Sequence, residues 1–546
     1  MAPIRLDLKN GTMDIDGAPL AALRWLRAFP ARLARACVDF AGYGGEATYL
    51  WPRWLFLRLV GVVFIFVFAG WIIEGPALVG PGGVEPIGDF LDSVLKQDPS
   101  LARFVFMPTV FWLSSGAKAI TVAGATGLLA AVALVLNLWP RLALFVCWLI
   151  QVSFVSACRE LAPAQLDGLV LELALLSIPF APRGLRPGLG RDSPPHRFAT
   201  FCLRWMVFRV MFQSGLVKLW STEKAWHDLG AMDRMYETAP FPTILGYLDH
   251  NLSHGWHLFE GAFTYVAELF APLAALAGRR GRWIAIPIWV VFQIGIQVTN
   301  NFGWLNVTAI VMGLLLLDDQ MIERAASLLG RRRITAPVAL PAKREVSVFR
   351  VLAFYVPLLM GLYFSSLEFG VRLLKIQPVL LPRWMERSML WAGTYRSANA
   401  YTLYEFVAMK RHHVEFQGTD DGGVTWKTYG FRFQPQALDR TCPFIAPYFA
   451  RFEATMQIMG QYASRRFIAE VGRALLEGNR ELGGLFRENP FPDHPPQAIR
   501  FPYYEFKFTD LETRRRTGNY WSKQYLDEYF PPLSKDPKTG KVRMGN

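Results

Sequence analysis

The chain has 546 residues, of which 52% are hydrophobic and 19% are charged, and its mean hydropathy is +0.21. Several stretches of roughly 17 to 22 residues carry almost no charge, which is the length at which a helix crosses a bilayer, so an ordinary soluble enzyme is excluded. The net charge of +14 does not indicate a nucleic-acid partner, because arginine clusters flank the apolar stretches as the positive-inside rule expects. We therefore predict a polytopic α-helical membrane protein.

The N-terminal segment, residues 1–50, is polar and then amphipathic. Residues 21–40 combine four arginines with Leu, Trp and Phe, which is typical of a helix lying in the membrane interface. We predict that residues 1–50 form a cytoplasmic amphipathic region. The first apolar run starts only after residue 50 and is too long for the core of a signal peptide, so we expect it to remain as a membrane anchor.

Residues 51–370 are predicted to form a transmembrane helical core of about nine spans. The expected ranges are 54–73, 117–138, 142–158, 164–181, 201–220, 257–277, 283–299, 303–317 and 349–369. A shorter apolar stretch, 104–113, is interpreted as interfacial or re-entrant. With nine spans the basic connections share one side of the membrane, and the residues after 370 lie on the opposite side.

Residues 371–533 differ in composition and are predicted to form an extramembrane α+β domain on the lumenal or periplasmic side. Apolar and polar residues alternate over 429–433 and 504–508, which is typical of half-buried strands. Residues 446–460 and 462–476 favour helices. The basic tail, residues 534–546, is expected to be disordered.

Ionic side chains occur inside two predicted spans. Charges at membrane depth are expensive and are normally paired, turned inwards or functional. Glu172 and Arg209 both fall near mid-membrane, so we predict a Glu172–Arg209 ion pair, which either stabilises the fold or binds a substrate. The predicted buried polar cluster consists of Asp167, Glu172, Arg204 and Arg209.

Lys218 lies near the outer end of the span 201–220 and is the candidate catalytic residue. It either extends its ammonium to the interface or acts as a base, if desolvation favours the neutral amine. The sequence leaves both interpretations open.

The loop 221–256 is polar and aromatic and is predicted to lie on the outer side. Its candidate site residues are Trp226, Asp228, Asp233, Tyr236 and Glu237. Hydrogen bonding within the loop or contact with a partner is the expected role of these side chains.

Neither a metal nor a cofactor is expected. His250 and His254 are spaced to share a helical face, but two histidines without a third fixed ligand do not make a metal site. The five cysteines include no CxxC pair, so we expect neither a disulfide framework nor a zinc site. Walker, GxGxxG, GxSxG and CxxCH motifs are also absent.

From about residue 50 to residue 533, short motifs resemble those of the lipase maturation factors, in the same order. The motifs in the predicted core are Gln165-x-Asp167 with Leu171-Glu172, Arg204-Trp205 with Phe208-Arg209, Gly215-x-x-Lys218-Leu219, Trp226-x-Asp228-Leu229, Asp233, Tyr236-Glu237-Thr238-x-Pro240, and Gly303-x-x-Asn306 with Asp318-Asp319. Those in the predicted outer domain are Cys442-Pro443 with Pro447-Tyr448, Asn489-Pro490-Phe491, Pro495-Pro496, and Tyr529-Phe530-Pro531-Pro532-Leu533.

The chain departs from the family pattern at two places. Met235 replaces a histidine that precedes the tyrosine of the outer-loop motif, and residues 452–456 replace a tryptophan-rich helix. The second departure lies in the outer domain, which in this family is thought to engage lipases, so it bears on client specificity.

The resemblance implies a membrane-bound, chaperone-like maturation factor that assists the folding and assembly of secreted proteins, by family lipases. Membrane lipid and client proteins are then the expected partners. Family members in animals act in the endoplasmic reticulum membrane, and a bacterial member would lie in the inner membrane.

The membrane core also resembles, more distantly, vitamin K-dependent γ-carboxylase, in which a lysine in a similar G-x-x-K-L context is the catalytic base. This resemblance implies an alternative: an intramembrane enzyme that uses Lys218 as base on a lipid-soluble substrate, with Glu172 and Arg209 shaping the pocket. The maturation factor remains the favoured hypothesis because the residues outside the spans offer no catalytic constellation of their own. A transporter is disfavoured, because the sequence has no inverted halves.

Overall fold

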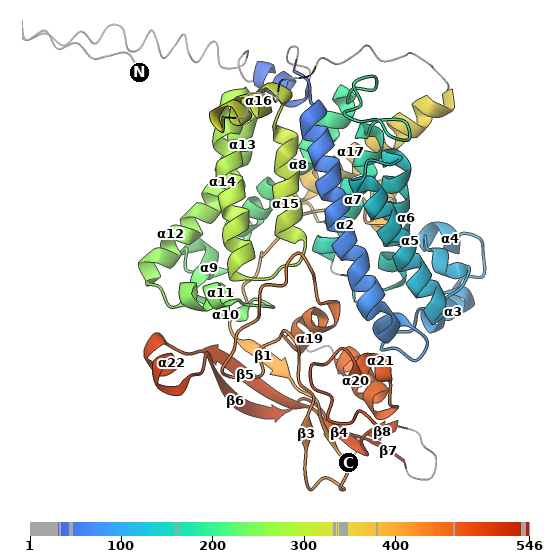
Figure 1. The fold of residues 1–546 in the computed structure, drawn as a ribbon, viewed down its shortest axis with the longest axis vertical. Coiled ribbons are helices and arrows are strands. Elements are labelled where there is room, and N and C mark those ends of the chain that lie inside the picture. The colour runs from blue at the N-terminus through green and yellow to red at the C-terminus, as the bar shows by residue number, and fades with distance from the viewer. Residues whose placement is uncertain are drawn as a thin grey trace, which may run out of the picture.

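The computed structural model describes residues 31, 34–42, 47–158, 161–162, 164–330, 335, 337, 348–377, 380–461, 465–536 and 542–544. Most of the predicted N-terminal region 1–50, and most of the basic segment 331–344, lies outside the described residues. Figure 1 shows a bundle of long helices and, at one end of it, a layer of strands and short helices built from the C-terminal part of the chain.

The bundle follows the predicted apolar stretches closely. Its long helices are α2 (Leu50–Val79), α5 (Ala117–Val135), α6 (Pro140–Ala157), α7 (Ala164–Phe180), α8 (Arg197–Trp220), α12 (His254–Tyr265) with α13 (Ala271–Leu276), α14 (Gly278–Thr299), α15 (Leu305–Gly313) and α17 (Val348–Leu373). A π-helical turn, η2 (Val266–Phe270), joins α12 to α13. Each predicted span therefore coincides with a helix.

Six described helices are long and apolar enough to cross a membrane, and the bent pair made by Leu305–Leu316 and α16 (Asp319–Leu328) would be a seventh. The predicted number of about nine spans is thus not confirmed. α7 has only 17 residues, and α8 carries three arginines and Lys218, so neither is identified as a span by length and composition. The stretch predicted to be interfacial or re-entrant forms α4 (Arg103–Phe106) and the 3-10 turn η1 (Val110–Trp112).

The basic connections lie at the end of the bundle opposite the strands (Figure 1). Their arginines bond to neighbouring backbone and carboxylate groups: Arg141 donates to Ala181 O at 2.9 Å, Arg53 to Ser193 O at 2.7 Å, and Arg279 to the Asp318 carboxylate at 2.8 Å. This arrangement agrees with the prediction that the basic connections share one side.

The C-terminal layer holds two antiparallel sheets, with strand orders β1-β5-β6 and β3-β2-β4-β7-β8. The strands are β1 (Arg411–Val414), β2 (Gln417–Thr419), β3 (Lys427–Thr428), β4 (Ala498–Arg500), β5 (Pro502–Phe508), β6 (Trp521–Glu528), β7 (Leu533–Lys535) and β8 (Val542–Met544). The main helices of the layer are α19 (Arg451–Gln461) and α20 (Arg465–Leu476), close to the predicted ranges. Below, this layer is called the outer domain.

Two predictions for the outer domain are wrong. Residues 429–433 are not a strand: Tyr429 and Phe431 are buried as expected, but the regular pairing stops at Thr428 and continues only as a single bridge at Gly430. The tail is not wholly disordered, because β7 pairs with β8 through the register Leu533↔Met544. The partner of Gly430 is Glu488, which is distant in sequence, so local alternation does not report it. The β7–β8 pair is local, and the basic composition of the tail did not indicate it.

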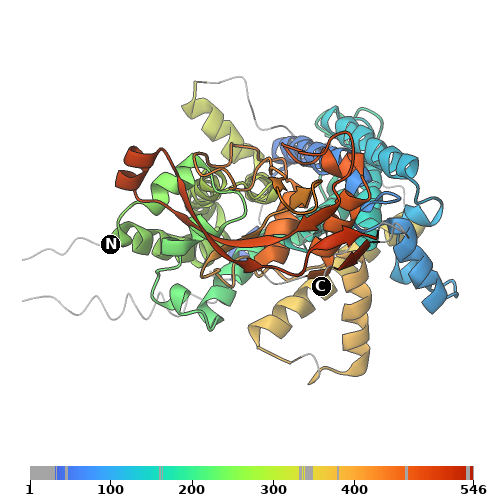
Figure 2. The same ribbon diagram turned by 90° about the horizontal axis from the view of Figure 1, so that it is seen from below.

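Short helices fill the space between bundle and strands. They are α9 (Lys224–His227), α10 (Met232–Thr238) and α11 (Ile244–His250) from the predicted outer loop, and α21 (Arg480–Gly483) from the outer domain. Seen from below, the β5–β6 ribbon runs across the end of the molecule (Figure 2). The bundle, the short helices and the sheets therefore form three successive layers.

Candidate functional site

The predicted ion pair between α7 and α8 is present. Glu172 and Arg209 are fully buried and in direct contact. Glu172 also accepts hydrogen bonds from the Tyr401 hydroxyl and from the Asn399 backbone N–H, both at 2.9 Å, and Arg209 donates to Asn399 O at 2.8 Å. The pair thus holds the segment 397–405, which leads into the outer domain, inside the end of the bundle.

Asp167 pairs with the outer domain rather than with the other predicted cluster residues. Its carboxylate receives two hydrogen bonds from Arg451, the first residue of α19, at 2.8 and 2.9 Å, and one from Gln151 at 2.6 Å. The Arg451 guanidinium also lies 4.0 Å from the ring centre of Trp71. A bidentate, fully buried Arg–carboxylate pair with an aromatic face above it is a strong and directional contact.

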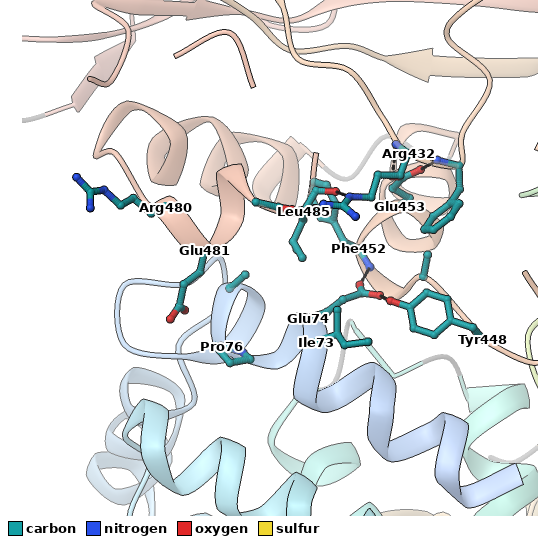
Figure 3. A pocket seen from close by; sticks show the side chains of 14 residues that line it. Ile73, Glu74, Pro76, Arg432, Tyr448, Phe452, Glu453, Arg480, Glu481 and Leu485 are labelled. Atoms are coloured by element: carbon teal, nitrogen blue, oxygen red, sulfur yellow. Dashed lines mark hydrogen bonds between the residues drawn. The ribbon is translucent and has the colours of Figure 1, made fainter. Parts of the chain in front are cut away.

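Glu74, near the outer end of α2, caps the start of α19. It accepts from the Phe452 N–H at 2.7 Å, from the Arg451 N–H at 3.2 Å, and from the Tyr448 hydroxyl (Figure 3). A carboxylate at a helix N-terminus satisfies free N–H groups and complements the helix dipole. This capping role of Glu74 was not predicted from the sequence, because the groups that donate to its carboxylate lie more than 370 residues further along the chain.

Lys218 is buried and fully engaged. Its ammonium donates to both carboxylate oxygens of Glu268, at 2.9 and 2.8 Å, to Leu403 O at 2.8 Å and to Ser214 O at 3.3 Å. It also lies 5.1 Å from the ring centre of Trp226. An ammonium has three N–H donors, and these contacts offer an acceptor to each of them.

Glu268 was not predicted from the sequence. It lies in the π-helical turn η2, a distortion that often occurs at functional sites and that here brings the carboxylate onto Lys218. The sequence signal was a lone acidic residue within an apolar stretch, which indicates a buried partner but not its identity.

Arg204 lies apart from the other three cluster residues, towards the end of α8 that faces the basic connections. Its guanidinium donates to Leu315 O at 2.8 Å and to Phe40 O at 3.0 Å, and it lies 4.7 Å from the Tyr49 ring centre. The four residues predicted as one cluster thus occupy three places along the bundle.

The candidate residues of the outer loop divide into two groups. Trp226 and Glu237 contact the outer domain: the Trp226 indole donates to Tyr404 O at 3.0 Å, and Glu237 accepts from the Phe508 N–H at 2.7 Å.

The other three loop residues bond within the loop and to α12. Tyr236 donates to Glu260 at 2.7 Å, Asp233 contacts His257 at 2.7 Å and His254 at 3.0 Å, and Asp228 accepts from the Gly230 N–H at 3.0 Å. Across the described ranges, no group of three or more His, Cys, Asp or Glu side chains is arranged to hold a metal ion.

Arg411 of β1 links the edge of the β1-β5-β6 sheet to the outer loop. Its buried guanidinium donates to the backbone oxygens at the end of α10, among them Pro240 O at 2.9 Å and Glu237 O at 3.1 Å. Burial lowers its pKa to about 9, which leaves it cationic at neutral pH. A cation at a helix C-terminus complements the helix dipole, so this contact stabilises both the loop and the sheet.

A cavity of about 610 Å³ opens beside these contacts, between the outer end of α2 and the outer domain (Figure 3). Its walls combine apolar side chains with three carboxylates, Glu74, Glu453 and Glu481, and with two arginines. The lining residues are Ile73, Glu74, Pro76, Ala77, Arg432, Phe433, Tyr448, Ala450, Phe452, Glu453, Arg480, Glu481, Gly484 and Leu485. Phe452 and Glu453, which line the cavity, belong to the segment 452–456 singled out in the sequence.

Comparison with known proteins identifies the family of this chain. A family model described as "Lipase maturation factor transmembrane domain" matches residues 51–324, and one described as "Lipase maturation factor C-terminal domain" matches residues 397–531. The protein belongs to the lipase maturation factor family. Among curated relatives, Lipase maturation factor 1 of Mus musculus is 25% identical over 92% of this chain and 90% of its own length.

Further relatives agree with this assignment. Lipase maturation factor 1 of Homo sapiens is 26% identical over 89% of this chain and 88% of its own length. Lipase maturation factor 2 of Homo sapiens is 26% identical over 88% of this chain and 82% of its own length. No solved structure matches the chain. The γ-carboxylase-like alternative finds no support in these comparisons.

The buried Asp167–Arg451 pair predicts a steep penalty for breaking it. Arg451→Met leaves the Asp167 carboxylate buried without its cation, so we expect the free energy of unfolding to fall by about 3–5 kcal/mol. The double variant Asp167→Leu/Arg451→Met should recover most of this stability, because it removes both charges. Thermal unfolding in detergent and limited proteolysis of the outer domain measure both. Arg473→Met is the control, since Arg473 is 30% exposed in its pairs with Glu470 and Glu477, and it should cost less than about 1 kcal/mol.

Glu453 predicts a pH dependence. It accepts from three successive backbone N–H groups, those of Arg432, Phe433 and Gln434, at 2.7 to 2.9 Å, and burial raises its pKa to about 7. The folded protein therefore binds this proton more tightly than the unfolded chain.

Because of this proton, the free energy of unfolding should fall by about 1.4 kcal/mol for each unit by which the pH rises between about pH 4.5 and about pH 7. Glu453→Gln has no proton to lose at this position, so the difference in free energy of unfolding between wild type and variant should change across this pH range. Denaturant unfolding at half-unit intervals from pH 4.5 to 8 tests this, and parallel curves for the two proteins would contradict it.

Proposed function

We propose that this protein is a membrane-bound maturation factor that assists the folding and assembly of secreted proteins, with lipases as its clients. The membership of the family, over nearly the whole chain, carries this proposal. The named relatives are called lipase maturation factors, and both the helical and the C-terminal family models match.

The proposed division of labour assigns client contact to the outer domain and anchoring to the bundle. Several large apolar side chains of the outer domain are exposed, as expected for a surface that binds partly folded chains: Phe406, Met409, Val424, Phe444, Tyr525 and Leu526. The buried links through Arg451, Glu74 and Arg411 would hold this surface in a fixed orientation above the membrane.

The proposed domain limits follow the same division: residues 1–50, 51–370, 371–533 and 534–546. The positive-inside rule favours the basic connections on the cytoplasmic side and the outer domain on the lumenal or periplasmic side. The compartment proposed is the endoplasmic reticulum membrane in a eukaryote or the inner membrane in a bacterium.

The ionic groups inside the bundle are proposed to be structural. Arg209 and Lys218 each have a buried carboxylate partner and backbone acceptors from the segment 397–405. This favours a role in holding that segment over proton abstraction by Lys218.

The direct test is lipase secretion. Deleting the gene from cells that express a secreted dimeric lipase should lower the specific activity of the secreted enzyme several-fold, without lowering its transcript, and the wild-type protein should restore it. Phe444→Ser, at a 57% exposed site of the outer domain, should restore it less well than Leu328→Ser, at an 84% exposed site at the opposite end of the bundle. Undiminished lipase activity in the deletion strain would refute the proposal.

A pair of variants separates this role from the enzymatic alternative. Lys218→Met alone leaves Glu268 uncompensated and should lower protein abundance, because a broken buried pair costs about 3–5 kcal/mol. Lys218→Met/Glu268→Leu removes both charges and should restore abundance together with lipase maturation. A double variant that is abundant but does not support lipase maturation would instead indicate that Lys218 takes part in a chemical reaction.

A further inference from the structure

A second cavity, of about 640 Å³, lies on the flank of the bundle. Its walls are the outer end of α8, the last two turns of α17, the helix α18 (Arg383–Tyr395) and residues 401–405. Figure 2 shows α17 and α18, in tan, projecting from the side of the bundle. The two helices meet where the Phe364 and Trp391 rings lie 6.0 Å apart, and in the figure they diverge towards their connecting segment.

The surroundings of this cavity have the character of a membrane interface. Trp220 ends α8, and Trp384 of α18 is 64% exposed. Leu374, Leu380 and Leu390 are each at least 68% exposed. Exposed leucines together with tryptophans at helix ends are typical of the boundary between acyl chains and headgroups. With the proposed topology, this cavity would face the bilayer at the level of the outer leaflet's headgroups.

Its lining has both an apolar and an ionic part. The apolar part consists of Leu216, Val217, Trp220, Phe369, Val371, Leu373, Ile376 and Met389. The ionic part holds two cations, Arg372 and Lys375, and two carboxylates, Glu368 and Glu405. Glu368 and Arg372 share one face of α17, since residues four apart on a helix are neighbours, and Lys375 lies just beyond the end of this helix at Leu373.

These four ionic groups are available to a ligand. None of them forms an ion pair with another described residue, and the Lys375 ammonium lies 5.1 Å from the Trp220 ring centre. Gln213 provides an independent sign of a missing partner. Its side chain is 4% exposed and lines the cavity, and its Nε2 has no acceptor within the described part of the chain. A buried amide donor without an acceptor costs free energy unless a ligand supplies one.

We propose that this cavity binds one phospholipid with a primary ammonium in its headgroup, of the phosphatidylethanolamine type. The phosphate would bond to Arg372 and Lys375, which are the side chains suited to phosphate oxygens. The ammonium would lie against Glu368 and Glu405, an acyl chain would cover the apolar wall, and an ester oxygen would accept from Gln213. Two cations and two carboxylates match a zwitterion better than an anionic lipid.

The site is also joined to the buried contacts of the bundle. Tyr401 lines the cavity, and it donates its hydroxyl to Glu172 at 2.9 Å and its backbone N–H to Gln213 Oε1 at 3.2 Å. Two residues further on, Leu403 O accepts from Lys218 at 2.8 Å. A bound lipid would therefore stabilise the segment that the two ion pairs hold.

Native mass spectrometry of the full-length protein tests the proposal, with palmitoyl-oleoyl phosphatidylethanolamine, phosphatidylglycerol and phosphatidylcholine added separately after delipidation. Wild-type protein should retain one phosphatidylethanolamine in preference to the other two. Arg372→Gln/Lys375→Gln should weaken its binding by roughly tenfold or more, as expected for the loss of charge-assisted phosphate contacts. Arg183→Gln/Arg186→Gln, which removes two exposed arginines of the same spacing at the opposite end, should leave binding unchanged.

The carboxylates give the sharper test. Glu368→Gln/Glu405→Gln should abolish the preference for phosphatidylethanolamine over phosphatidylglycerol while leaving phosphate binding. Thermal unfolding confirms that each variant is folded. Equal phosphatidylethanolamine binding by wild type and the Arg372→Gln/Lys375→Gln variant would overturn the proposal, as would a wild-type preference for phosphatidylglycerol.

Discussion

The contact on which the arrangement of the two layers depends is the buried pair of Asp167 and Arg451. Each charge is fully buried, and neither could remain so without the other, because an unpaired charge in an apolar interior costs several kcal/mol. Arg451 begins α19, and Glu74 caps the same helix turn, so α7 and α2 together fix the position of α19. The outer domain is thereby placed by charges that belong to the bundle.

The same requirement explains why so many ionic groups inside the bundle do not form one active centre. Glu172 and Arg209 hold Asn399, Lys218 and Glu268 hold Leu403, and Arg204 bonds to backbone oxygens nearer the basic end. In each case the charge is matched by groups of the same chain. Among the described residues, the exposed face of the outer domain and the two cavities remain as surfaces where a partner could bind.

The sequence predicts an ion pair correctly where two charges are both buried and each therefore needs a partner. Glu172 and Arg209 were paired correctly, because both charges fall at the same depth in neighbouring apolar stretches and each requires a partner. It failed where the partner lies far along the chain: Arg451 is 284 residues from Asp167, and nothing in the local pattern around Arg451 distinguishes it from a surface arginine. Glu268 was missed for the same reason, since its partner Lys218 lies 50 residues away. The number of about nine spans is not confirmed, because α7 is short and α8 carries buried charges, so neither is identified as a span by length and composition.

The segment 397–405 joins these observations. It has no regular secondary structure, yet it contributes backbone oxygens to Arg209 and Lys218 and a hydroxyl to Glu172, so its order depends on ion pairs from α7, α8 and η2. Residues 401, 402 and 405 also line the cavity on the flank of the bundle. Any ligand that binds there only when this segment is in place must stabilise it by mass action. If the proposed lipid and the proposed client both bind only when segment 397–405 is in place, each would strengthen the binding of the other, because both draw on the same equilibrium between the ordered and the displaced segment.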